Sequence, residues 1–375
     1  MIRTTVSLAA LAGLLCTAAA PAQTRKAPPR AGTAASADAF VADAEKQLAA
    51  ASVPNNQINW VNATNITDDT DALAAASNAQ LTELQVSLAN QAAAFAKTPR
   101  LSFDTRRKLD LLRGGITLPA PDRPGAADQL ATLTTKMSSF YGKGRGTLGG
   151  KPINGSDIEA AMGTTRDPAK LQEMWTSWHD NVGAPMRSDY ARMATLANEG
   201  AKGLGYPDTG AMWRSAYDMP PEQFAATTDK IWNEVKPLYL ALHTYVRWKL
   251  NEKYGDAVQP KTGPIRADLL GNMWAQEWGN IYPLVAPAGS GDLGYDIGEL
   301  LRAKGKTPLD MVHYGEGFYS SLGFEALPKT FWERSLFVKP ADREVVCHAS
   351  AWDIDNKDDI RIKMCTKVNS EDFVT

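Results

Sequence analysis

The chain has 375 residues, of which 44% are apolar and 22% charged, proportions typical of a folded protein and not of a disordered or collagen-like one. Its 40 lysines and arginines nearly balance 42 aspartates and glutamates, so no basic surface favours nucleic acid as a partner. Three cysteines and four histidines are too few for a cysteine-rich or histidine-rich metal cage.

The amino-terminal segment has the pattern of an export signal. Arg3 precedes an apolar run of alanine and leucine that ends in small residues typical of a cleavage site. We therefore expect residues 1–22 to be a signal peptide. A lipid anchor at Cys16 is the alternative, but Leu15 is larger than the residue that normally precedes a lipidated cysteine.

No later apolar stretch is long enough to span a bilayer, so the sequence predicts no integral membrane span. We expect the mature chain to lie in the periplasm of a bacterium or to be secreted after signal cleavage. In such an oxidising compartment the two remaining cysteines, Cys347 and Cys365, are a candidate disulfide. The chain-entropy argument gives a cross-link over a loop of this size about 3 kcal/mol of stabilisation.

The first part of the mature chain reads as a linker followed by helices. Residues 23–37 are rich in alanine, proline, glycine and serine, a composition that predicts a flexible linker. Asp38 is the expected N-cap of the first helix. A longer helical stretch is predicted from Ile58 to Ala96, because alanine, leucine and glutamine dominate it.

The middle of the chain is also predicted to be helical. The glycine-rich segment Gly142–Lys151 lacks the Ser or Thr of a phosphate-binding loop, so a surface loop is expected there. Another helix begins at Pro221, is kinked by Pro237 and ends at Gly255. Its expected apolar face consists of Phe224, Ile231, Val235 and Leu238, and core positions are also expected for Trp213, Trp232, Trp248, Trp274 and Trp278.

Two segments near the carboxyl end have β character instead. Glu344–Trp352 and Asp359–Thr366 predict a small hairpin, which could bind an extended peptide by strand addition. His348 lies in this hairpin and is the best functional candidate among the histidines; a buried, hydrogen-bonded strand histidine is the alternative. The sequence contains no HExxH, CxxC or GxSxG motif.

The last residues predict the opening of a helix. Asn369 is a good N-cap, Glu371 and Asp372 fill an acidic first turn, and Phe373 begins an apolar face. A helix this short does not support itself, so we expect a truncated chain or a partner segment elsewhere. A frayed natural tail is the alternative.

Several long motifs resemble the angiotensin-converting enzyme family of zinc peptidyl-dipeptidases. They are, in the family's order, DTGAMWRSAYD, PLYLALHTYVR, GPIRADLLGNMWAQEW, VVCHASAWD and RIKMCT, between Asp208 and Thr366. The resemblance runs from about Asp157 to Thr375 and is weaker over the amino-terminal helices. It implies a mainly α, zincin-like helical peptidase fold of that type, here incomplete. Residues 38–375 would be its amino-terminal part, with lid-type helices over 38–100.

The resemblance also assigns site residues. His348 matches the histidine that holds a substrate carbonyl, and Ala349 matches the residue whose backbone pairs with the peptide. Gln276 matches the glutamine that binds the substrate's terminal carboxylate, Asp372 an acidic residue on the leaving side, and Tyr217 a tyrosine near a chloride site.

Further expectations follow from the same resemblance. Cys347 and Cys365 match a family disulfide, and His179 stands where some members bind a second chloride through arginine, which puts that ion in doubt. Zinc is the family's cofactor, but its HHExGH motif would lie just beyond Thr375, so no catalytic residue or metal ligand is expected here. The sequence thus predicts the amino-terminal portion of a peptidase that releases carboxyl-terminal dipeptides, inactive alone. The alternative is a non-catalytic periplasmic helical protein that binds peptides.

Overall fold

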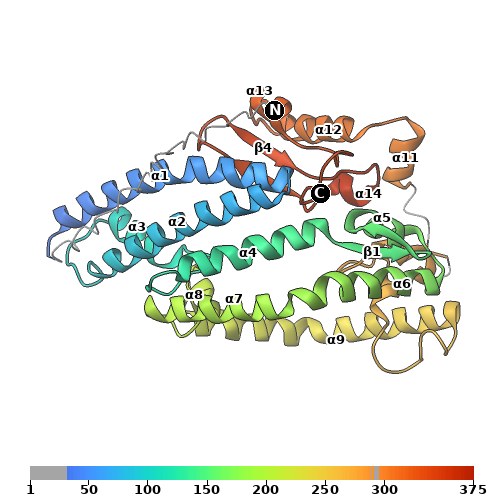
Figure 1. Ribbon diagram of the computed structural model, residues 1–375. Coiled ribbons are helices and arrows are strands. Elements are labelled where there is room, and N and C mark those ends of the chain that lie inside the picture. The colour runs from blue at the N-terminus through green and yellow to red at the C-terminus, as the bar shows by residue number, and fades with distance from the viewer. Residues whose placement is uncertain (1–31, 288, 291–294) are drawn as a thin grey trace, which may run out of the picture.

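The structure is a computed structural model that describes residues 32–287, 289–290 and 295–375 (Figure 1). The predicted signal peptide and linker residues 23–31 lie outside the described residues. The described residues are mainly helical, as expected, and their strands form two antiparallel hairpins. The elements are α1 (Ala34–Thr64), α2 (Asp68–Ala93), α3 (Phe103–Gly114), α4 (Ala126–Lys143), β1 (Arg145–Leu148), β2 (Lys151–Asn154), α5 (Gly155–Thr164), α6 (Pro168–Trp178), π-helix η1 (His179–Gly183), α7 (Ala184–Gly203), α8 (Thr209–Arg214), α9 (Pro221–Tyr254), 3₁₀ turns η2 (Ala267–Leu270) and η3 (Gly279–Ile281), α10 (Tyr282–Val285), α11 (Ile297–Ala303), α12 (Pro308–Ser321), α13 (Lys329–Arg334), β3 (Ser350–Asp353), β4 (Ile360–Lys363) and α14 (Ser370–Val374).

The first helix begins earlier than the sequence predicted. Thr33, and not Asp38, is its N-cap, and the Thr33 hydroxyl accepts a hydrogen bond from a first-turn amide at 3.1 Å. Asp38 accepts a hydrogen bond from the Thr105 hydroxyl of α3 at 2.5 Å instead. The linker predicted over residues 23–37 is therefore wrong at its carboxyl end, where burial of Ala37 in a hydrophobic cluster favours the helix.

The long helix predicted from Ile58 to Ala96 is divided between two helices. α1 ends at Thr64, and Thr67 caps α2 by accepting a hydrogen bond from the amide of Thr70 at 3.1 Å. This short break lets α1 and α2 fold back beside each other (Figure 1).

The glycine-rich segment that was predicted to be a surface loop contains a second hairpin. β1 pairs with β2, and Gly149 and Gly150 make the turn with φ angles of 60° and 74°. Positive φ angles suit glycine, which explains why this turn is glycine-rich. Glu173 of α6 accepts hydrogen bonds from both turn amides, at 2.9 and 2.8 Å.

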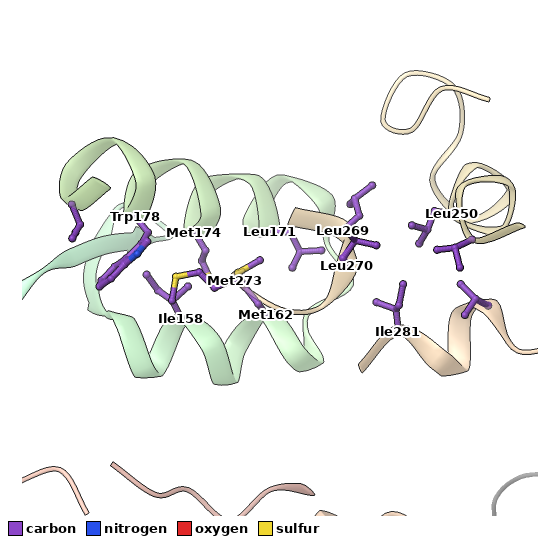
Figure 2. Packing of buried hydrophobic residues seen from close by; sticks show 13 residues of the cluster. Ile158, Met162, Leu171, Met174, Trp178, Leu250, Leu269, Leu270, Met273 and Ile281 are labelled. Carbon is purple, nitrogen blue, oxygen red and sulfur yellow. The ribbon is translucent and has the colours of Figure 1, made fainter. Parts of the chain in front are cut away.

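The largest hydrophobic core lies where α5, α6 and the carboxyl end of α9 meet the η2 turn. Figure 2 shows these side chains packed in one layer between the helices. Its members are Ile158, Met162, Leu171, Met174, Trp178, Val182, Val246, Leu250, Leu269, Leu270, Met273, Ile281 and Val285. This cluster holds in place α5 and the loop after η2, two elements of the site described below.

The helix α9 has the predicted start and end but not the predicted burial. Pro221 is in its first turn, Pro237 lies inside it, and Gly255 ends it with a φ of 77°. The face that was expected to be buried is largely exposed at Ile231, Val235 and Leu238. The core expectation is also wrong for four tryptophans, which are exposed: Trp213, Trp232, Trp248 and Trp274. The described residues therefore cover this part of α9 only partly. None of their helices is long and apolar enough to cross a bilayer.

Two leucines on α9 allow a direct test of this packing. Leu250→Ala should lower the free energy of unfolding by about 2–5 kcal/mol, because Leu250 is fully buried and its loss leaves a cavity. Leu238→Ala, at a side chain that is 75% exposed, should change it by less than about 0.5 kcal/mol. Urea unfolding would measure both, and equal losses would contradict the packing.

Candidate functional site

The second hairpin is shorter than the sequence predicted. β3 pairs antiparallel with β4, with Ser350 opposite Lys363, so His348 and Ala349 precede the strand and are not part of it. The preceding segment is held by other contacts: the Val346 amide donates to the carbonyl of Ala63, at the end of α1, at 2.9 Å. The residues after β4 also bond outside the hairpin: the Met364 amide donates to the carbonyl of Leu336 at 2.8 Å.

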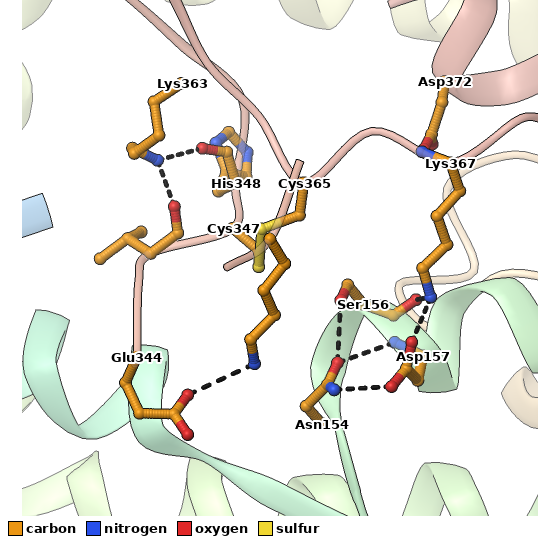
Figure 3. The surroundings of a disulfide bond; sticks show 12 residues. Asn154, Ser156, Asp157, Glu344, Cys347, His348, Lys363, Cys365, Lys367 and Asp372 are labelled. Carbon is orange, nitrogen blue, oxygen red and sulfur yellow. Dashed lines mark hydrogen bonds and ion pairs between the residues drawn. A yellow bond between two sulfur atoms is a disulfide. The ribbon is translucent and has the colours of Figure 1, made fainter. Parts of the chain in front are cut away.

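The predicted disulfide between Cys347 and Cys365 is confirmed, with the two Cα atoms 5.0 Å apart (Figure 3). It fastens the segment before β3 to the residues after β4. The Lys363 ammonium adds a second connection, donating to the carbonyl oxygens of Val346 and, at 2.6 Å, of His348.

His348 has an exposed side chain, so the alternative of a buried strand histidine is wrong. Its Nδ1 lies 3.0 Å from the carbonyl oxygen of Ala349, which leaves Nε2 as the ring nitrogen that can bond to another group. Ala349 is half-buried. The imidazole and the adjacent main chain therefore form one edge that a ligand can reach.

A carboxylate that the sequence analysis missed, Glu159 of α5, belongs to the same site. It accepts a hydrogen bond from the Trp274 indole at 2.8 Å. Burial raises the pKa of Glu159; the Trp274 hydrogen bond opposes this shift, the charge of Asp372 adds to it, and His348 opposes it. No specific sequence signal marked Glu159, because any amphipathic helix carries such a carboxylate on its polar side.

The predicted cap of the last helix is confirmed. Asn369 accepts a hydrogen bond from the amide of Asp372 at 2.6 Å. Burial raises the pKa of Asp372 and also that of Glu371, whose shift is increased by the charges of Glu159, Glu277 and Asp372. The first turn of α14 thus places the carboxylates of Glu371 and Asp372 close to that of Glu159, and we call these three carboxylates the acidic wall.

Lys367 fixes α14 against α5. Its amide donates to the Asp372 carboxylate at 2.6 Å, and its ammonium donates to the carbonyl of Ser156 at 3.0 Å and pairs with Asp157 (Figure 3). Its side chain therefore bridges the end of the chain to a helix more than two hundred positions earlier. The relative position of Glu159 and Asp372 depends on this bridge.

Gln276 lies on the loop between η2 and η3. Its side chain is exposed. Two neighbours on that loop reach the acidic wall: Trp274 bonds to Glu159, and Glu277 acts on the pKa of Glu371. The loop that carries Gln276 therefore borders the carboxylates of Glu159 and Glu371.

Tyr217 is not part of this group. It follows α8, which lies far from α14 in Figure 1. Its side chain is exposed and stacks on Phe224, with ring centroids 4.2 Å apart. His179, the position linked to the second chloride, stacks on Trp175 at 4.0 Å. Neither environment tests a chloride ion.

The part of the chain that the structure describes contains no group of three or more His, Cys, Asp and Glu side chains that could hold a metal ion. The acidic wall has carboxylates, but they do not form such a set. These residues thus do not fit a zinc site of their own.

Fold and site together define a helical protein with an open histidine edge, tied by a disulfide, beside a partly buried acidic wall. The family model described as angiotensin-converting enzyme matches residues 31–375, and the chain belongs to that family. Angiotensin-converting enzyme of Haematobia irritans exigua is 34% identical over 344 residues, 90% of this chain and 55% of that protein. The enzyme of Mesocricetus auratus is 40% identical over 277 residues, 72% of this chain and 20% of that protein. That of Bos taurus is 46% identical over 219 residues, 58% of this chain and 16% of that protein. The chain therefore spans about half of the insect relative and less of the mammalian ones.

The raised pKa of Glu159 predicts a pH-dependent gain in stability for Glu159→Gln, which keeps an acceptor for Trp274. The ionised carboxylate destabilises the folded state above its raised pKa, and this cost disappears as the pH falls below the unfolded value. The variant should therefore be more stable than the wild type at pH 7, and the difference should shrink toward pH 4.

Glu173→Gln is the control of opposite sign. Hydrogen bonds from the amides of Gly150 and Gly149 lower the pKa of Glu173, so its charge stabilises the folded state at neutral pH. This variant should be less stable at pH 7, with the loss fading as the pH falls. Urea unfolding from pH 4 to 8 measures both, and changes of the same sign would contradict the electrostatic assignment.

Proposed function

We propose that this chain forms the peptide-binding wall of a zinc-dependent peptidyl-dipeptidase, an enzyme that releases dipeptides from the carboxyl end of peptides. Residues 38–375 would be the amino-terminal part of its helical domain, with α1 and α2 as lid helices. Family membership over residues 31–375 supports the class of enzyme. The observation that carries the proposal is the exposed His348–Ala349 edge beside the carboxylates of Glu159 and Asp372.

The groups on this wall suit an extended peptide. Because Nδ1 of His348 donates to the Ala349 carbonyl, Nε2 can donate to a substrate carbonyl when the ring is an imidazolium. The main chain at Ala349 can pair with the peptide backbone, as in strand addition. Gln276 can donate its amide hydrogens to the terminal carboxylate of the substrate. Glu159 and Asp372 would favour a basic side chain on the leaving side.

Zinc would supply the hydrolytic chemistry of this class, by polarising the scissile carbonyl and activating water. Residues 1–375 contain no HExxH motif, and the described residues form no ligand set. We therefore assign no hydrolytic step to this chain and propose that it is inactive without a zinc-holding part. A chloride ion near Tyr217 belongs to the same proposal.

Export is part of the proposal. Cleavage of residues 1–22 would deliver the chain to the periplasm or the medium. The disulfide between Cys347 and Cys365 supports an oxidising location, because such bonds persist there and are rare in reducing compartments.

Purified residues 23–375 should not hydrolyse peptides, with or without added zinc. They should bind a short peptide with a free terminal carboxylate weakly, with a Kd of about 1 mM or higher, because one wall provides few contacts. Chromatographic detection of released dipeptide and titration calorimetry measure the two quantities. Zinc-dependent hydrolysis by this chain would refute the proposal.

Two controls test the carboxylate contact, and the size of the Kd separates the proposal from a stand-alone binding protein. Amidation of the peptide terminus and Gln276→Ala should weaken binding to a similar extent, since both remove the carboxylate contact. A micromolar Kd for the wild type would instead favour the alternative, a non-catalytic peptide-binding protein.

The exposed apolar surface of α9 supports the idea that further protein covers it in the working enzyme. Patches of this kind usually mark interaction sites or cause aggregation. The purified chain should therefore bind a hydrophobic dye, and Leu238→Glu combined with Ile231→Glu should reduce dye fluorescence without lowering stability. Leu73→Glu, at an exposed leucine of α2, is the matched control and should leave the fluorescence nearly unchanged.

A further inference from the structure

Lys363 is a buried lysine beside the candidate site. Lys363 is only 2% exposed, and its ammonium contacts two main-chain carbonyls, those of Val346 and His348. Among the described residues it makes no ion pair with a carboxylate, and burial alone lowers its pKa to about 8. Burying a charge without a counter-charge is costly, and an apolar side chain of the same length would avoid that cost.

The two carbonyls explain what offsets the cost. Residues 346 and 348 lie before β3, so they lack the ladder hydrogen bonds of a paired strand. Carbonyls two residues apart lie on the same side of an extended chain, and one ammonium can reach both. Hydrogen bonds from a charged donor are stronger than those between neutral groups.

Lys363 and the disulfide act on consecutive residues. The ammonium holds the carbonyls on either side of Cys347, while Cys347 itself is bonded to Cys365. The Cys365 amide also donates to the Cys347 carbonyl, at a long 3.4 Å. The edge that begins at His348 is thus held by Lys363 and the disulfide (Figure 3), while the His348 side chain is exposed.

We propose that Lys363 is a positioning residue, which holds the His348–Ala349 edge in the conformation that receives a peptide. This inference rests on the proposed function, because it assumes that the edge contacts a peptide. Lys363 itself does not touch the ligand, since it is buried behind the segment.

The test compares Lys363→Met, which keeps the length of the side chain, with Lys363→Gln, which keeps a neutral donor. Hydrogen exchange followed by mass spectrometry should show at least tenfold faster exchange at the amides of Val346 and Cys365 in Lys363→Met. The peptide affinity of Lys363→Met should fall about tenfold. The exchange rates and affinity of Lys363→Gln should lie between those of Lys363→Met and the wild type. The melting temperature should change little, because removal of the buried charge compensates for the lost hydrogen bonds.

Lys357→Met is the matched control, because Lys357 is an exposed lysine on the same hairpin. It should leave exchange and affinity unchanged. Unchanged exchange at Val346 and Cys365 in Lys363→Met would overturn the inference. So would a loss of affinity that follows global unfolding, which a purely structural lysine would produce.

The readouts also separate this inference from the proposed function. If the wild type binds no peptide, the proposed function fails and the positioning role fails with it, whatever the exchange shows. If the wild type binds peptide and only Lys363→Met fails to fold, Lys363→Gln decides: faster exchange and weaker binding support the positioning role, and wild-type values overturn it.

Discussion

Three side chains at every second position, from the last residue of β4 onward, hold the candidate site together. Lys363 bonds to the carbonyls before β3, Cys365 forms the disulfide to Cys347, and Lys367 bridges to α5. Side chains two apart lie on one face of an extended chain, so this face meets both the histidine edge and the acidic wall. The relative position of His348 and Asp372 is therefore set by one short run of residues.

The hydrogen bonds and the disulfide that hold the site act beside buried ionisable groups whose charged forms are destabilised. Burial raises the pKa of Glu159, Glu371 and Asp372 and lowers that of Lys363, and each shift means that the charged form is disfavoured at the site. Groups of this kind do not stabilise a fold by themselves. The stabilisation comes from the apolar cluster beneath them, in which Ile158 on α5 and Met273 near Trp274 anchor both sides of the wall.

The sequence predicted those features that depend on local chemistry. The cap at Asn369, the start of α9 at Pro221 and the disulfide were all correct, because each depends on a few neighbouring residues or on the compartment. The first helix was placed too late, because Thr33 and Asp38 are both good caps and only burial of Ala37 decides between them. The hairpin of β1 and β2 was missed, because four-residue strands show too little alternation to distinguish them from a loop.

The candidate site itself was predictable only in part. Site roles for His348, Ala349 and Asp372 came from the family resemblance. Glu159 joins them through a hydrogen bond to Trp274, 115 residues away, and through the charges of Asp372 and His348, which no local pattern encodes. The prediction of which side chains are buried failed for a related reason. Apolar periodicity shows which face of a helix prefers to be covered, but the covering surface must come from elsewhere, and for the tryptophans of α9 the described residues do not provide it.

The two exposed surfaces therefore differ in physical meaning. The His348 edge is polar and hydrogen-bonded, so it can stay open to water at little cost. The apolar side of α9, with Ile231, Trp232 and Leu238, gains nothing from water and is stabilised only by burial. The two surfaces therefore differ in their effect on the free energy of the chain in water, because only the apolar face of α9 loses stabilisation by staying exposed.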